Sequence, residues 1–155
     1  MIKSPRPAQK KITIFILCAL CAAVLLCLCT IAFRKVKLIQ MGLDALSIFA
    51  MEQHATGYPA DVGITSVTQL KKLLMEKAYL TAGQVEDLHL ERFDIGNVSK
   101  SDPAETIAIR SKSNIFPGNM VIVHLGGDCG SHRSPQIQEL ENKHEPPRNP
   151  PWLAP

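Results

Sequence analysis

Four residues whose side chains bind metals or act as nucleophiles lie close together near the end of the chain. They are His124, Asp128, Cys129 and His132. Cys129 and His132 have the Cys-x-x-His spacing that forms half of a structural zinc site, and Asp128 or His124 could add a further ligand. A complete site usually has two such pairs, and this sequence shows one. The four residues are therefore weak metal candidates, and the simpler interpretation is a tight Gly-Gly-Asp turn before Cys129.

The sequence around these residues lacks the arrangements typical of catalysis. Cys129 and His132 could act as nucleophile and base, but no third orienting group or oxyanion hole is indicated. The Gly126-Gly127 pair has neither the spacing nor the following helix of a phosphate-binding loop. We therefore expect no enzymatic activity and no cofactor.

One apolar run, residues 12–33, contains no charged residue. As a helix, about 22 residues at about 1.5 Å each span roughly 33 Å, enough for a hydrocarbon core of about 30 Å. The run is longer than a typical secretory signal, although Thr30-Ile31-Ala32 is a weak cleavage candidate. We predict a retained single-pass transmembrane helix in contact with membrane lipid. Cys18-x-x-Cys21 has the spacing of a redox motif. Because the pair lies inside the apolar run, the simpler interpretation is that both cysteines are small, polarizable residues of a membrane helix.

Basic residues gather beside the apolar run, and the rest of the chain is acidic. Seven of the 17 Lys and Arg residues flank the run, and the remaining ten are outnumbered by 14 acidic residues, so residues 38–155 carry about −4. The basic residues therefore suit lipid head groups, and nucleic-acid binding is not expected. The more basic side of the run favours a cytoplasmic leader, residues 1–11, with the rest of the chain outside the cytoplasm.

The helix is expected to continue beyond the membrane as a stalk, residues 34–53, because no helix breaker occurs before Gly57-Tyr58-Pro59. A narrow polar stripe interrupts an otherwise apolar stalk, so either the chain's own domain or neighbouring copies must cover it. A small domain, residues 54–133, follows. Its second helix begins near Ser66, which has capping-box spacing with Gln69, and we expect Tyr79-Leu80 to close that helix and pack inward.

Alternating and β-branched segments predict an antiparallel sheet in this domain. The strand candidates are residues 88–95, 106–110, 120–125 and 130–133. Residues 134–155 hold six of the 11 prolines and few apolar residues, so we expect a disordered tail. The predicted fold class is α+β: a long transmembrane and stalk helix, a second helix and a small antiparallel sheet.

The order of these features resembles the pseudopilins of type II secretion and type IV pilus systems. The resemblance rests on Lys10-Lys11, the apolar run and its stalk, Thr56-Gly57-Tyr58-Pro59, Lys77-Ala78-Tyr79-Leu80 and the stretch from Asp102-Pro103 to Asp128, and it covers roughly residues 10–133. The family's prepilin cleavage motif is absent, because Lys11 precedes Ile12-Thr13-Ile14-Phe15-Ile16 without the expected Gly and Glu. The cleavage and filament-pairing roles of that motif therefore do not carry over.

The resemblance implies a structural or interaction subunit of a secretion or pilus-type assembly, whose partners are other pilin-like or secretion-system subunits. It also implies the bacterial inner membrane, with the domain in the periplasm. The alternative is a stand-alone membrane-anchored binding module with an unknown ligand.

Overall fold

The computed structural model describes residues 7–112, 119–133 and 152–155. The chain forms two compact units, residues 1–37 and residues 38–155, and each is described by itself. Residues 1–6 of the predicted leader and residues 134–151 of the predicted tail lie outside the described residues.

Helix α1 (Pro7–Thr56) contributes to both units. Its N-terminal part is long and apolar enough to cross a membrane, and it is the one candidate span among the described residues. Within that apolar window no residue is buried against the rest of the described chain, unlike the core helix of a soluble domain. Length and composition alone support this assignment, and a signal sequence would also meet them.

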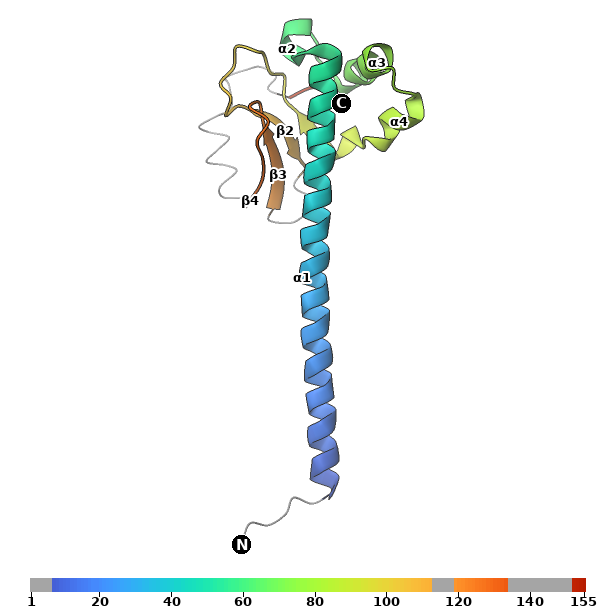
Figure 1. The fold of residues 1–155 in the computed structure, drawn as a ribbon, viewed down its shortest axis with the longest axis vertical. Coiled ribbons are helices and arrows are strands. Elements are labelled where there is room, and N and C mark those ends of the chain that lie inside the picture. The colour runs from blue at the N-terminus through green and yellow to red at the C-terminus, as the bar shows by residue number, and fades with distance from the viewer. Residues whose placement is uncertain (1–6, 113–118, 134–151) are drawn as a thin grey trace. The chain divides into compact units, whose positions relative to one another are not determined.

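The second unit adds short helices and a sheet to the end of α1, and so has the predicted α+β class (Figure 1). The elements are α2 (Pro59–Val62), α3 (Val67–Lys77), α4 (Ala82–Asp87), a 3₁₀ turn η1 (Leu90–Arg92), β1 (Phe93–Ile95), β2 (Ile107–Ser111), β3 (Asn119–His124) and β4 (Cys129–Arg133). Helix α4 was not expected. Its start is fixed by a capping box in which Thr81 and Gln84 each bond the other's backbone N–H.

Helix α1 ends where the sequence predicted. Gly57 has φ 74°, a conformation that favours glycine, and Pro59 begins α2 at a position where its missing N–H is no loss. The unit that packs around this end is larger than the predicted domain, because it starts at residue 38 and includes most of the predicted stalk.

Helix α3 begins after Ser66 as expected, and the Ser66 side chain accepts a hydrogen bond from the Gln69 N–H. The return half of the predicted capping box differs: Gln69 Oε1 accepts from the Thr65 N–H at 2.8 Å. The expectation for Tyr79 was wrong. Its φ is 56° and its side chain is 89% exposed, while the neighbouring Leu80 packs against the core.

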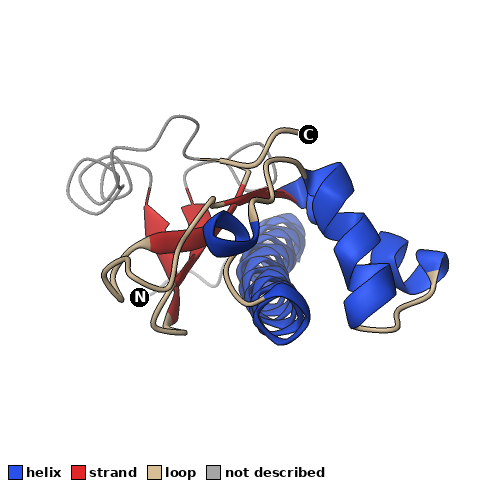
Figure 2. Cartoon of the chain, turned by 90° about the horizontal axis from the view of Figure 1, so that it is seen from above, coloured by secondary structure: helices blue, strands red, loops and turns tan. Residues whose placement is uncertain are grey.

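The four strands form an antiparallel sheet in the order β1-β2-β3-β4. Strand β2 shifts register between Ile107 and Ile109, and β3 pairs with β4 without interruption across five positions. All four strands overlap the segments that the sequence predicted. In Figure 2 the end of α1 is seen along its axis beside the sheet.

The main core lies between one face of the sheet and the end of α1. Met41, Ala45 and Ile48 form the buried stripe of α1, at intervals of four and three residues. They belong to one cluster with sheet residues and with α3 and α4 side chains. The members on strands β1 to β3 and on helices α3 and α4 are Phe93, Ile95, Ala108, Ile109, Val121, Val123, Leu70, Leu74 and Val85.

A second, smaller cluster covers the opposite face of the sheet. Ile107 and Ile122 are 3% and 0% exposed, and Met120 and Trp152 pack against them. Residues 152–155 are thus part of the domain, and Leu153 is buried in the main core. The prediction of a disordered tail was wrong for these four residues. It rested on the high proline content of residues 134–155 and gave no weight to Trp152 and Leu153.

The buried stripe of α1 ends in a carboxyl group. Glu52 is 2% exposed, and burial raises the pKa of its side chain to about 8. A folded-state pKa above the usual value means that the folded state binds the proton more tightly than the unfolded state. Stability is therefore fully present below about pH 4.5 and is lost as the pH rises towards about 8.

We predict that Glu52→Gln removes this pH dependence. The wild-type chain should lose up to about 5 kcal/mol of unfolding free energy between pH 4.5 and pH 8, and the variant should not. Denaturant unfolding of the full chain in detergent at several pH values measures the difference. The matched control is Glu76→Gln, an exposed carboxyl, and equal pH profiles for wild type and Glu52→Gln would contradict the assignment.

Candidate functional site

The predicted site residues lie at the β3–β4 hairpin. His124 ends β3, Asp128 belongs to the turn, and Cys129 and His132 lie on β4. The His124 N–H donates to the Asp128 carbonyl at 2.8 Å, and the Gly127 N–H donates to the His124 carbonyl. These two backbone hydrogen bonds close the turn, and Gly127 adopts φ 88°, a conformation that favours glycine.

The register of the hairpin separates Cys129 from the histidines. Cys129 pairs with Val123, whose side chain lies in the main core, so Cys129 faces α1. Its Sγ lies 3.9 Å from the Gly42 carbonyl oxygen of α1. Burial of the sulfur against α1 raises the pKa of the Cys129 thiol, which makes it a poor nucleophile near neutral pH.

His132 lies on the other face of the sheet. It pairs with Met120, a member of the smaller cluster, and its Nε2 would be 3.1 Å from a Cβ placed on Gly130. The His132 and His124 rings meet edge to face with centroids 6.4 Å apart. His124 Nδ1 lies 2.7 Å from the Glu105 carbonyl oxygen and so donates its proton there.

The structure therefore brings two of the four candidates together and places Cys129 away from them. Within residues 7–112, 119–133 and 152–155 no group of three or more His, Cys, Asp or Glu side chains could hold a metal ion. Two histidines alone are a poor ligand set, because structural zinc sites use four protein ligands and catalytic ones three. The weak metal hypothesis gains nothing from this geometry.

The sequence did not indicate an apolar groove that the structure forms between α1 and the β4 edge. Its volume is about 310 Å³. One wall comes from α1 and the other from β3 and β4. The lining residues are Leu38, Ile39, Gly42, Leu43, Leu46, Val121, Cys129, Gly130 and Ser131. A Cβ placed on Gly42 would lie 3.5 Å from Cys129 Sγ, so this glycine lets β4 approach α1 closely.

The α1 side of this groove exposes two large aliphatic side chains. Ile39 and Leu43 are 64% and 60% exposed and lie one helical turn apart, on the same face of α1. The buried stripe of Met41, Ala45 and Ile48 thus accounts for one part of the helix surface only. We name Ile39, Leu43 and the groove beside them the α1 apolar surface.

Comparisons with known proteins give no assignment. No protein-family model matches the chain, and no curated protein and no solved structure shows a significant match.

The histidine pair yields a titration prediction. Partial burial lowers the pKa of His132 below its usual value, and the positive charge that His124 can carry lowers it further. His124→Gln should raise the pKa of His132 part of the way back, because burial remains. NMR titration of the imidazole signals of the full chain measures the pKa of His132 in the wild type and in His124→Gln. The control is His54→Gln, which replaces an exposed histidine. An unchanged His132 titration in His124→Gln would show that the two rings are not coupled.

Proposed function

We propose that the chain is a non-enzymatic, single-pass membrane-anchored protein that acts as a structural or interaction subunit of a pseudopilin-like assembly. The observation that carries the proposal is the α1 apolar surface. Burying a large aliphatic side chain contributes about 1.5–3 kcal/mol relative to leaving it in water. Ile39 and Leu43 leave that free energy unused in the isolated domain, and a protein partner would recover it.

The chemistry of this surface favours a partner with an apolar helix. No side chain that lines the groove is charged, so desolvating it has no ionic cost. The close approach at Gly42 is already used by Cys129 of the same chain, so a partner would contact the exposed side chains of Ile39 and Leu43 instead. Helices that pack in this way place their aliphatic side chains in the grooves of the neighbour. Subunits with similar apolar helices are the partners that fit.

The membrane assignment completes the proposal. The candidate span near the N-terminus would anchor the chain, and the basic residues on both sides of it would lie at the lipid head groups. The larger number of basic residues before the span supports a cytoplasmic N-terminus and a domain outside the cytoplasm. A bacterial inner membrane with a periplasmic domain is the location that the pseudopilin resemblance implies.

One observation favours the second candidate function, an anchored module that binds a small apolar ligand. The groove volume of about 310 Å³ lies at the lower end of the range for ligand pockets. Such a module would work as a monomer, and this separates the two functions experimentally.

The experiment compares Leu43→Asp with Val62→Asp. Both residues are exposed and apolar, at 60% and 51%, but Val62 lies on α2 and does not line the groove. After cross-linking in native membranes and solubilisation in mild detergent, the wild-type chain and Val62→Asp should recover the same apolar-helix subunits. Leu43→Asp should recover less than about one tenth of them, as expected for a loss of 1.4 kcal/mol or more.

A chain that stays monomeric in native membranes, or a Leu43→Asp variant that assembles as well as wild type, would reject the interaction function. Saturable binding of a small apolar molecule to that monomer would then support the second candidate.

A further inference from the structure

Residues 152–155 lie in extended form between two parts of the domain that are distant in sequence. The Leu153 N–H donates to the Ile95 carbonyl at 2.9 Å, which extends the edge of the sheet beside β1. The Ala154 N–H donates to the Thr65 carbonyl at 2.9 Å, and the Ala154 carbonyl accepts from the Val67 N–H at 2.7 Å. The segment thus joins the β1 edge to the start of α3.

Alternation along the extended segment sends its two large side chains to different clusters. Leu153 is 7% exposed and belongs to the main core, whereas Trp152 packs against Ile107 and Ile122 on the opposite face. The Arg110 guanidinium lies over the Trp152 ring at 4.1 Å from its centroid. This combination of backbone bonds and alternating pockets is the way proteins recognise an extended peptide at a sheet edge.

The walls of this site are held by contacts that do not involve the segment. Thr65 is fixed by Gln69, whose Oε1 accepts from its N–H and its hydroxyl at 2.8 and 3.2 Å. On the sheet, the Gly96 N–H donates to the Ala108 carbonyl at 2.6 Å.

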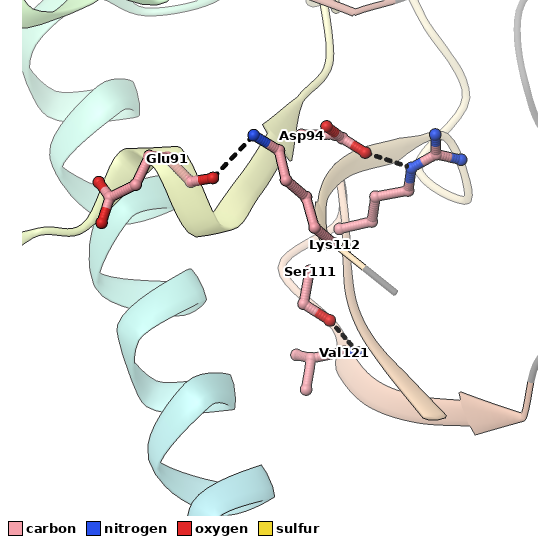
Figure 3. Close-up of polar contacts among 6 residues, drawn as sticks. Glu91, Asp94, Ser111, Lys112 and Val121 are labelled. Atoms are coloured by element: carbon pink, nitrogen blue, oxygen red, sulfur yellow. Dashed lines mark hydrogen bonds and ion pairs between the residues drawn. The ribbon is translucent and has the colours of Figure 1, made fainter. Parts of the chain in front are cut away.

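The Arg110 side chain is fixed in the same way. Its Nε donates to Asp94 Oδ2 at 3.0 Å, and Figure 3 shows Asp94 pointing toward the guanidinium on the neighbouring strand. The two residues after Arg110 are also held: Ser111 Oγ accepts from the Val121 N–H of β3 at 2.9 Å, and Lys112 Nζ donates to the Glu91 carbonyl of η1 at 2.7 Å (Figure 3).

We propose that this is a pre-formed peptide-binding site and that residues 152–155 are its tethered ligand, a strap that can be released and rebound. The site recognises an extended Trp-Leu-small sequence through the β1 edge, the start of α3 and the Arg110 side chain. The occupant is the chain's own segment, bound intramolecularly. This inference does not depend on the proposed assembly function, because the strap binds at the β1 edge of the sheet, whereas the α1 apolar surface lies beside β4.

The test uses the fact that Trp152 is the one tryptophan of the chain. Deletion of residues 152–155 from the full-length chain in detergent gives a tryptophan-free acceptor, and the synthetic peptide Pro-Pro-Trp-Leu-Ala-Pro carries the reporter. We expect saturable binding with a blue shift of tryptophan emission, and recovery of the thermal stability lost on deletion. A peptide in which the tryptophan is replaced by alanine should bind at least tenfold more weakly.

Two variants of the acceptor test the role of Arg110, one inside the site and one outside it. Arg110→Ala in the deleted chain should weaken peptide binding between about twofold and thirtyfold, the range expected for loss of a cation–π contact. Lys72→Ala, an exposed residue of α3 outside the site, should not change it. A folded acceptor that shows no saturable binding, or equal binding of the alanine peptide, would overturn the proposal.

A second experiment applies if the chain without residues 152–155 does not fold. A specific protease site is inserted between Lys143 and His144, and the full chain is cut after folding. The proposal expects the cut fragment to stay bound and to be displaced by excess labelled peptide. A fragment that cannot be displaced without unfolding the domain would show a fixed structural element and would overturn the proposal. An oligomer that appears on mixing intact and deleted chains would overturn the intramolecular assignment.

Discussion

Packing of the end of α1 against the sheet is the interaction on which the rest of the domain depends. Met41, Ala45 and Ile48 meet the β2 and β3 side chains Ile109, Val121 and Val123 in one core. A four-stranded sheet of three- to six-residue strands buries too little apolar surface to fold without such a partner. The same contact fixes the direction of every side chain on the sheet, since a shift of one residue would exchange its two faces.

This exchange of faces explains which parts of the site the sequence could predict. The spacing of Cys129 and His132 suggested a common ligand set, but an odd difference of three residues places them on opposite faces of a strand. Once residues 129–133 form a strand, the pair is divided. The strands themselves were predictable from their β-branched residues, although Val121 and Val123 belong to the main core and Ile122 to the other side.

The continuous apolar runs of β2 and β3 indicate that both faces of the sheet are buried. Ile107-Ala108-Ile109 and Val121-Ile122-Val123 lack the polar positions of a strand with one wet face, and a fully buried strand is the usual cause of such a run. A cover for the second face was therefore required. Trp152 supplies it, yet a proline-rich surrounding made residues 134–155 read as a tail. Local chemistry did predict the end of α1 at Gly57 and the start of α3 after Ser66, because each depends on adjacent residues only.

Two faces of α1 now have different roles. One face is buried in the domain, down to Glu52, whose raised pKa is a cost of placing a carboxyl group in that core. Ile39 and Leu43 lie on the other face, where the domain supplies no cover, and this division is the physical basis of the proposed assembly. The central claim is that residues 38–56 belong to the folded domain and unfold with it. Hydrogen exchange of the full chain in lipid nanodiscs tests the claim directly, with Val121→Ala as the perturbation. The account predicts that this substitution speeds exchange in β2, β3 and residues 41–52 by the same factor. Faster exchange in the strands with unchanged exchange in residues 41–52 would contradict it.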